Sequence, residues 1–227
     1  EIFFSLLSAN PYLEIGDDPL RYMSKSNTKN IKKILRKNEQ LHFELYDGKS
    51  DLEKYLQTLF AVEEQSTKQL RSMAIFAEKE KRDFFTNMVR HCKKYVRIGI
   101  LYYQETPIAY QFGFYYRDIF LAHQTAYLYE YRKLDPGKTM LVSLLLTLKG
   151  SSVRFFDFGG GMSLYKREFT PQYHCLYNVY FSENIFVLSW LRLINNLRRY
   201  NQQLFPKKFT KDHEFLFRTT FEPPNTN

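Results

Sequence analysis

Residues Phe120–Phe169, the stretch that decides the fold, read FLAHQTAYLYEYRKLDPGKTMLVSLLLTLKGSSVRFFDFGGGMSLYKREF. The apolar run Ile119–Leu128 overlaps its start and predicts a strand, because such runs bounded by turn residues are typical of strands. The letters DPGKT follow, and Asp135 is suited to cap a helix that is predicted to cover Pro136–Lys149. A second apolar run, Val153–Phe158, predicts a buried strand before three glycines. The stretch is therefore predicted to be a strand, a turn, a helix and a strand.

The start of the predicted helix is flanked by three cations, Arg132, Lys133 and Lys138. A helix N-terminus presents unpaired backbone N–H groups and the positive end of the helix dipole, so it attracts an anion. We therefore expect a phosphate-holding turn at Pro136–Thr139. The alternative interpretation is a capped helix whose charges are only solvated.

Two short motifs in this region resemble nucleotide sites, and both are rejected. The DPGKT letters end like a nucleoside-triphosphate loop, but that loop needs a glycine where Arg132 stands. Asp157-Phe158-Gly159 matches the metal-binding triplet of protein kinases. However, no glycine-rich loop opens the chain, and His123 stands where a magnesium-binding asparagine is required. Neither a P-loop protein nor a kinase is expected.

Three predicted strands joined by short turns lead into the helix. Tyr95–Tyr103 and Ile108–Tyr116 precede the strand at Ile119–Leu128, and the turns are predicted at Glu105-Thr106-Pro107 and Arg117-Asp118. Consecutive strands joined by such turns pair antiparallel. An antiparallel meander is therefore predicted.

The remaining elements are helices and single strands. Residues 1–16 are apolar and predicted to be irregular, as is the tail from Pro206. Periodicity predicts helices at Asp17–Gln40, Ser50–Gln69, Lys79–His91, Leu164–Phe169 and Asn184–Asn201, and strands at Leu41–Tyr46 and His174–Phe181. This order predicts an α/β protein of the mixed α+β type, with a mixed, mostly antiparallel sheet and helices on both faces.

The composition is that of a basic globular protein. Of the 227 residues, 44% are hydrophobic, and the formal net charge is +9. A basic surface attracts nucleic acid, phosphorylated cofactors or acidic lipids. Cys92 and Cys175 have no metal-type spacing and are too few for a disulfide scaffold, so we expect no metal site and a cytoplasmic protein. No apolar run approaches the roughly 18 residues of a membrane span, so no transmembrane segment is expected.

The segments Ala126–Gly150 and Val153–Phe169 resemble the GNAT superfamily of acyl-CoA N-acyltransferases. More narrowly, they look like the branch associated with cellulose and exopolysaccharide biosynthesis. Members of that branch carry an aromatic-rich strand, a Pro-Gly before the helix and an Asp-Phe-Gly…Tyr-Lys-Arg-x-Phe block. The resemblance is best over Ile98–Phe169 and extends loosely to Asn10–Leu13 and the basic helix at Ser24–Asn38.

The resemblance implies a domain division and a cofactor loop. Residues 1–40 are expected to be an N-terminal segment with a basic helix, a remnant of an upstream half. Residues 41–205 are expected to be the GNAT-like domain, and residues 206–227 an irregular tail. The superfamily's phosphate loop reads Gln/Arg-x-x-Gly-x-Gly/Ala. Here Arg132 and Gly137 match it, but Asp135 replaces the first glycine and is expected to turn inward and cap the helix.

The resemblance also implies acyl transfer from acyl-CoA, with an acetyl or longer chain, to a small-molecule amine. His123 is expected to be the general base, because its unperturbed pKa suits proton transfer near neutrality. Asp157 is expected to orient the amine or the histidine, and Tyr165 to protonate the thiolate. Residues expected to bind CoA are Arg132, Lys133, Pro136, Gly137, Lys138 and Thr139, and those expected to contact the acceptor are Tyr127, Glu130 and Lys166. Each of these side chains also has a purely structural interpretation.

Two other functions remain open. The related Fem-type transferases share this fold and use aminoacyl-tRNA, and the charge of +9 suits such a donor. The basic helix, residues 25–37, is accordingly a candidate contact for tRNA, an acyl carrier protein or the CoA 3′-phosphate. The third alternative is a non-catalytic module that binds an anionic partner on a decayed acyltransferase fold.

Overall fold

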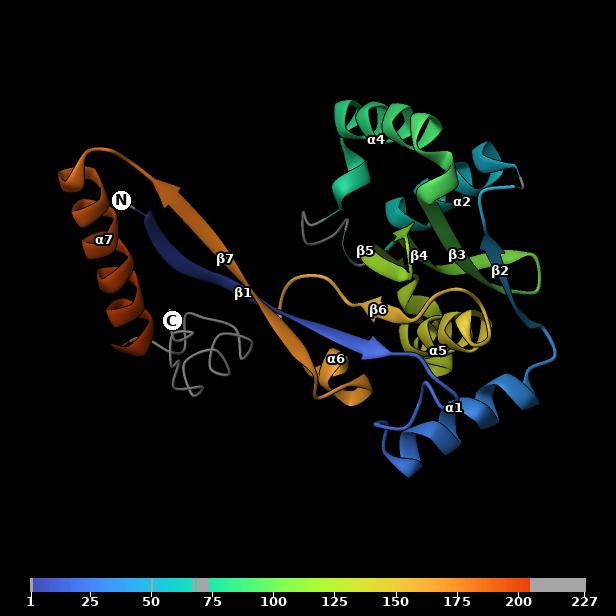
Figure 1. The fold of residues 1–227 in the computed structure, drawn as a ribbon. Coiled ribbons are helices and arrows are strands. Elements are labelled where there is room, and N and C mark those ends of the chain that lie inside the picture. Colours follow the sequence, from blue (N-terminus) through green and yellow to red (C-terminus); the bar gives the residue numbers. More distant parts are fainter. Residues whose placement is uncertain (1, 50, 67, 69–73, 205–227) are drawn as a thin grey trace. The chain divides into compact units, whose positions relative to one another are not determined.

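The structure, a computed structural model, describes residues 2–49, 51–66, 68 and 74–204. The chain divides into two compact units (Figure 1). The larger is Leu13–Phe158, and the smaller combines Glu1–Tyr12 with Gly159–Asn227. These units cut across the predicted segments 1–40 and 41–205, because a strand near the N-terminus pairs with one near the other end of the chain. The predicted irregular tail, 206–227, lies outside the described residues.

The larger unit contains a sheet of strands in the order β2-β3-β4-β5-β6. Neighbours among β2 (Leu41–Tyr46), β3 (Val96–Tyr103), β4 (Thr106–Tyr116) and β5 (Ile119–Tyr127) run antiparallel. The short β6 (Phe155–Asp157) runs parallel to β5. The predicted meander and the mixed, mostly antiparallel sheet are confirmed.

Tight turns join the strands of the meander. Tyr103 pairs with Thr106, so the first turn is Gln104-Glu105, and its prediction at Glu105-Thr106-Pro107 was wrong because Thr106 already belongs to β4. Gln104 has a φ of 54°. A positive φ there matches the twist of the paired strands, as two-residue hairpin turns require. The second turn lies at Arg117-Asp118, as predicted.

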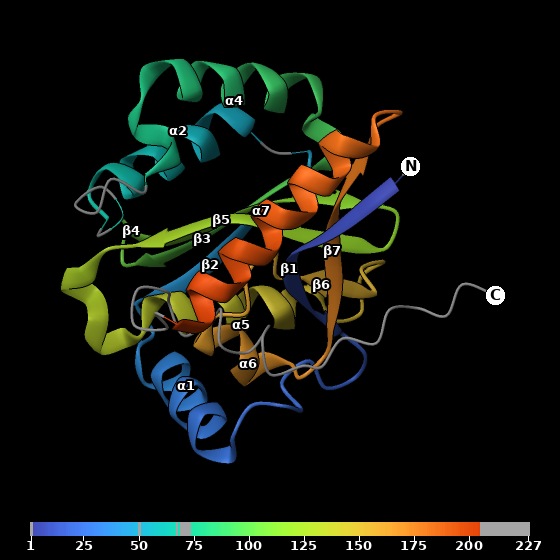
Figure 2. The same cartoon turned by 90° about the vertical axis from the view of Figure 1, so that its left-hand side faces the viewer.

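Helices cover both faces of this sheet (Figures 1 and 2), as predicted. One face carries α2 (Leu52–Glu64), the short helix η1 (Ile75–Ala77) and α4 (Lys79–His91). The other carries α5 (Pro136–Leu148), with α1 (Lys25–Lys37) packed against it. We call the first of these the α2/α4 face.

Alternation along the strands divides the core between the two faces. Ile100 and Tyr110 belong to the apolar cluster under α2 and α4, whereas the adjacent Leu101 and Ala109 pack with Met140 of α5. Successive side chains of a strand point to opposite faces, so each strand of the meander contributes to both layers.

Capping residues set where α1 and α2 begin. The Ser24 hydroxyl accepts a hydrogen bond from the Asn27 amide (3.1 Å), and the Asp51 carboxylate accepts one from the Glu53 amide (3.0 Å). Such caps satisfy N–H groups that have no partner inside the helix. The predicted helix at Asp17–Gln40 was therefore too long at its start, because the cap is Ser24 and the preceding residues form turns.

The smaller unit is built on an antiparallel pair of strands, β1 (Ile2–Glu14) and β7 (Tyr173–Phe181). The prediction that residues 1–16 are irregular was wrong, because the partner strand that orders them is distant in sequence. The unit also contains α6 (Leu164–Phe169) and α7 (Ile185–Leu204). Within the described ranges, no helix has the length and hydropathy needed to cross a membrane.

Candidate active site

The loop after β5 ends in an unusual backbone conformation at Asp135. A short helix, η3 (Tyr129–Leu134), leads to Asp135, whose φ of 44° and ψ of 55° lie in the left-handed region. The Thr139 amide donates to the Asp135 carbonyl (2.9 Å), and the Thr139 hydroxyl donates to the Leu134 carbonyl (2.7 Å). These bonds close the turn and fix the first turn of α5.

The Asp135 side chain does not cap α5. The expectation that it does was wrong, because a capping side chain reaches the first amides from an extended backbone and Asp135 is left-handed. Glycine adopts the left-handed conformation most readily, and aspartate is among the few other residues that tolerate it. Asp135 therefore has a backbone conformation that glycine favours, and it adds a carboxylate to the turn.

The side chains around this turn are mainly cationic and aromatic. Arg132 and Lys133 are exposed, and the Arg132 guanidinium lies 4.7 Å from the centre of the Tyr129 ring. Lys138 and the fully buried Thr139 belong to the first turn of α5, which Pro136 opens. Glu130 is exposed on η3.

Tyr127 lies against the first turn of α5. A Cβ added at Gly137 would lie 3.4 Å from Cδ1 of the Tyr127 ring. The end of β5 is thus in contact with the helix N-terminus, and the structure brings the predicted CoA-binding residues and Tyr127 together.

His123 occupies a β-bulge in β5. Phe112 pairs with Gln124 and Gly113 pairs with Ala122, so His123 is the extra residue. A bulge interrupts the alternation of side chains and is common next to active sites. Here it places His123 and the adjacent Gln124 on one face. The His123 ring lies 5.7 Å from Phe85 of α4, and the Gln124 amide donates to Glu63 of α2 (3.2 Å).

The surroundings of His123 favour its neutral form. Its ring also lies 5.9 Å from the rings of Phe112 and Phe114 of β4. His123 is exposed to solvent, but desolvation of its ring by these neighbours, together with the positive charge of Lys68, lowers its pKa below the usual 6.5. A neutral imidazole at pH 7 is able to accept a proton, as a general base must.

Asp157 ends the parallel pairing of β5 and β6. It is the last residue of β6 and pairs with Leu121, and His123 follows two residues later on β5. The pairing between the two strands therefore stops just before the bulge, so Asp157 and His123 lie at the same end of the β5–β6 pair.

Tyr165 and Lys166 belong to the smaller unit. The Lys166 ammonium donates to the carbonyls of Gly159 (3.1 Å) and Gly160 (2.8 Å), and the residue is only 7% exposed. This gives Lys166 a role in closing the glycine turn. Tyr165 is 39% exposed, and desolvation of its hydroxyl raises the pKa of that group.

Sequence reasoning missed Glu63, which is fully buried at the end of α2. The signal was present, because Glu63 follows Leu59 and Phe60 at helical spacing and so continues the apolar face of α2. Among the described residues, no group of three or more His, Cys, Asp or Glu side chains is arranged to hold a metal ion.

The family described as "Acetyltransferase (GNAT) domain" matches residues 25–167, which include the meander, the Asp135 turn and β6. The chain belongs to this family. The comparison with curated protein sequences gave no match for this GNAT protein.

Solved structures share the fold of this GNAT protein at low identity. The L-PGS of Bacillus licheniformis is 12% identical with a TM-score of 0.55, over 86% of this chain and 66% of that chain. The C-terminal domain of a putative lysylphosphatidylglycerol synthetase from Agrobacterium fabrum is 10% identical with a TM-score of 0.58, over 78% and 61%. FemX is 10% identical with a TM-score of 0.54, over 81% and 58%. The chain thus spans less than two thirds of each of these proteins.

Proposed function

We propose that this GNAT domain transfers an acyl group from acyl-CoA, with an acetyl or longer chain, to the amine of a small molecule. The observation that carries the proposal is the Asp135 turn, a glycine-like loop at a helix N-terminus with three cations around it. Pyrophosphate is an anion of the kind that such a helix end binds. The turn follows the strand that carries His123, with the short helix η3 between them.

The residues of the loop suit the phosphates of the donor in several ways. Arg132, Lys133 and Lys138 supply positive charge, and the amide of Gly137 lies in the first turn of α5. Two residues of the loop offer no backbone N–H to a phosphate: Pro136 has none, and the amide of Thr139 already donates to the Asp135 carbonyl. Acyl-CoA, when bound at this loop, would supply the thioester that the amine attacks.

In the proposed reaction, the amine nitrogen forms a bond to the thioester carbonyl carbon and the C–S bond breaks. His123 accepts the proton that the nitrogen loses, and its lowered pKa leaves it neutral for this task. Asp157 orients the amine or the imidazole. Tyr165 returns a proton to the departing thiolate, and its hydroxyl is protonated at neutral pH as that of an ordinary tyrosine is.

The resemblance to the exopolysaccharide branch supports an amino sugar as the acceptor and surface polysaccharide biosynthesis as the setting. We place the reaction in the cytoplasm. Tyr127, Glu130 and Lys166 are the residues proposed to contact the acceptor, although the Lys166 ammonium is also engaged by the glycine turn.

The test is amine-dependent release of free CoA thiol from acetyl-CoA and from longer acyl-CoAs, measured over a panel of amino sugars. The proposal predicts thiol release that requires both the enzyme and an amine, with an N-acylated product detected by mass spectrometry. Absence of product for every donor and acceptor, in a protein that binds acyl-CoA, would contradict transfer to these amines.

Replacing Asp135 by asparagine is expected to tighten acetyl-CoA binding. Asparagine also tolerates the left-handed backbone, so the turn is kept while one negative charge beside the phosphates is lost. Removing a like charge at contact distance is worth at least about 1 kcal/mol, or roughly fivefold in Kd. Titration calorimetry measures the change, and Asp17→Asn, an exposed carboxylate outside the loop, serves as the control. Weaker binding by Asp135→Asn would argue against phosphate at this turn.

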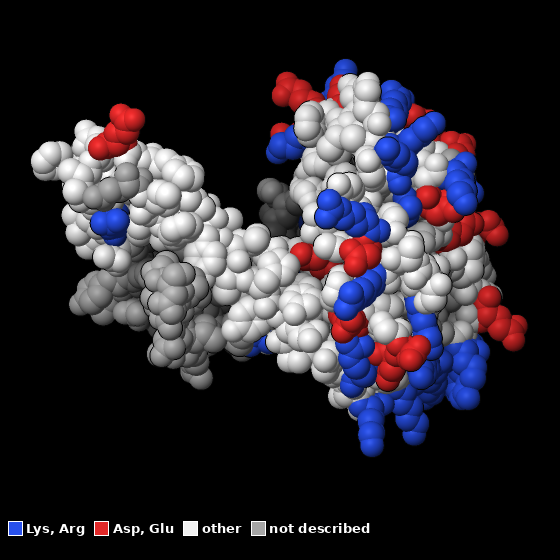
Figure 3. Space-filling model, in the orientation of Figure 1, with Lys and Arg blue, Asp and Glu red and all other residues white. Residues whose placement is uncertain are grey.

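One observation favours a second candidate, an aminoacyl-tRNA donor as in the Fem-type transferases. Helix α1 contains no acidic residue and has six exposed cations, which gather over one end of the larger unit in Figure 3. They are Lys25, Lys29, Lys32, Lys33, Arg36 and Lys37. A cluster of this kind is the electrostatic footprint of a nucleic-acid contact. An acyl carrier protein, which is also anionic, would bind the same helix.

Charge reversal on α1 distinguishes these donors. Under the tRNA candidate, Lys29→Glu combined with Lys32→Glu and Lys33→Glu is expected to abolish tRNA binding, because each phosphate contact contributes to affinity through counterion release. Under the leading proposal, the same variant keeps its affinity for acetyl-CoA. Filter binding at several salt concentrations measures the effect, with reversal of the exposed Lys79 and Lys93 as the control.

A further inference from the structure

We propose that Glu63 is a positioning residue for the transferase site, because it anchors the bulge of β5 that presents His123. The inference deepens the proposed function and rests on it for its kinetic consequence. Glu63 contacts neither the substrate nor His123 in the proposed role. It acts through Gln124, the residue that follows His123 in β5.

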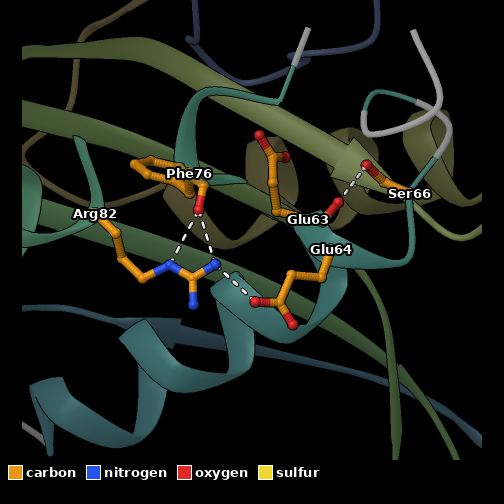
Figure 4. A network of polar contacts seen from close by, with 5 residues as sticks. All are labelled: Glu63, Glu64, Ser66, Phe76 and Arg82. Carbon is orange, nitrogen blue, oxygen red and sulfur yellow. Dashed lines mark hydrogen bonds and ion pairs between the residues drawn. The ribbon is translucent and has the colours of Figure 1, made fainter. Parts of the chain in front are cut away.

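Two adjacent carboxylates at the end of α2 face in different directions. Figure 4 shows Glu64 paired with Arg82, at 2.6 Å, while the Glu63 carboxylate points away from that pair. Arg82 also donates to the carbonyl of Phe76 in η1 (2.9 and 3.0 Å). Arg82 is thus already engaged by Glu64 and Phe76, and Glu63 is 0% exposed. Burial of a carboxylate is costly unless hydrogen bonds compensate it.

The Glu63 carboxylate receives three hydrogen bonds from three other elements. One oxygen accepts from the Tyr110 hydroxyl of β4 (2.5 Å). The other accepts from the backbone amide of Ile75 at the start of η1 (3.0 Å) and from the side-chain amide of Gln124 in β5 (3.2 Å). Hydrogen bonds to a charged acceptor are about twice as strong as neutral ones. Glu63 therefore fastens α2, η1, β4 and β5 at one point.

The contact of Glu63 with β5 lies next to the bulge. Gln124 directly follows His123, and its backbone carbonyl accepts from the Gln111 side chain (3.2 Å), which also donates to the Phe112 carbonyl (3.0 Å). The side chain of Gln124 is held by Glu63 and its backbone by Gln111, and both glutamines are buried. The extra residue His123 is consequently kept on the α2/α4 face.

A purely stabilising role does not explain this choice of residues. A buried ionic network is often no more stable than apolar side chains of similar volume, and position 63 continues an apolar helix face. Leucines at positions 63 and 124 would fill the space without fixing the bulge. The polar network defines which residue of β5 bulges, and hence where the imidazole lies.

The experiment compares Gln124→Leu with Ser66→Ala. Gln124→Leu removes the link between Glu63 and β5 and keeps the side-chain volume. Ser66 is as buried as Glu63 and donates to the Glu63 backbone carbonyl (2.8 Å), so Ser66→Ala weakens the same helix end and leaves the carboxylate network intact. Two readouts are taken: the NMR shifts of the His123 ring protons, assigned by their loss in His123→Asn, and kcat with KM.

In Gln124→Leu, we expect the chemical shifts of the His123 ring protons to move toward the values of free histidine. The reason is that the imidazole would no longer lie in the ring-current fields of Phe85, Phe112 and Phe114. We also expect kcat to fall about 10- to 100-fold, with KM for acyl-CoA nearly unchanged. Ser66→Ala is expected to change neither. Glu63→Gln, which keeps the volume and loses the charge, is expected to act in the same direction and replaces Gln124→Leu if that variant does not fold.

Unchanged His123 ring shifts in a folded Gln124→Leu or Glu63→Gln variant would overturn the proposal. A shift in Ser66→Ala as large as in Gln124→Leu would also overturn it, because any loosening of α2 would then suffice. If the wild-type protein transfers no acyl group, the proposed function fails. The ring shifts still decide whether Glu63 positions His123.

Discussion

Replacing His123 by alanine is expected to lower kcat about 10²-fold or more and to leave KM for acyl-CoA nearly unchanged. A positioned general base typically contributes this much to a rate. His123 is suited to the role because the bulge aims it at the α2/α4 face and its pKa lies below 6.5. Steady-state kinetics over a range of amine concentrations checks the prediction.

The control for His123→Ala is His91→Ala. His91 is exposed at the end of α4, and its ring nitrogen Nδ1 lies 2.7 Å from the Asn87 carbonyl oxygen. We expect it to retain wild-type rates. A His123→Ala enzyme whose kcat stays within about threefold of wild type would show that His123 is not the general base.

The pH dependence of the rate is a second test of whether His123 is the general base. A base must be neutral to act, so the rate is expected to fall as the pH drops through the His123 pKa, below 6.5. Desolvation of the ring by its aromatic neighbours lowers this pKa most, and the Lys68 charge adds to the effect. Lys68→Met removes the repulsion of protonated His123, so its pKa rises and the acid limb moves to higher pH. Lys68→Arg keeps the charge and should keep the wild-type profile.

Replacing Gly113 by alanine is expected to be the most destabilising single change at the site. A Cβ at this position would lie 2.5 Å from the Leu121 carbonyl oxygen and 2.7 Å from the Phe120 ring. Both are held by β5, which comes close to β4 at the bulge. Overpacking of this kind costs about 3 kcal/mol. For a protein of this size, the melting temperature should fall by about 6–12 °C.

Gly160→Ala is the matched control for Gly113→Ala. A Cβ at Gly160 would meet nothing closer than 3.8 Å, so its effect should stay within about 0.5 kcal/mol. Differential scanning calorimetry of both variants measures the difference. Equal melting temperatures for Gly113→Ala and wild type would contradict the prediction, because β4 and β5 would then have room for a Cβ at position 113.

The meander and the helix at Pro136 were predictable because their signals are local. Aromatic and aliphatic runs separated by short turns specify β3, β4 and β5, and Pro136 and Gly150 bound the apolar helix. The strand β1 was missed because its order depends on pairing with β7, near the other end of the chain. Local apolarity did not reveal that partner.

The site was only partly predictable for a similar reason. The sequence indicated His123 and the cationic turn, since both consist of residue types with a known chemistry. The bulge at His123 depends on the register between β4 and β5, which no local pattern specifies. The prediction that Asp135 caps α5 was wrong because its backbone is left-handed, and residue type alone does not specify that conformation. Glu63 continues the apolar face of α2 although it is a carboxylate, and a charged residue at such a position is a local signal of a buried polar contact.

The most direct test of the central claim is thermal melting with acetyl-CoA, a long-chain acyl-CoA, free CoA and tRNA. If the Asp135 turn binds acyl-CoA, a donor at 100 times its Kd should add about 2.7 kcal/mol of stability. The melting temperature should then rise by about 5–10 °C. The account predicts this rise with an acyl-CoA and none with tRNA. No rise with any CoA species at millimolar concentration would contradict it, and a rise with tRNA alone would favour the aminoacyl-tRNA donor.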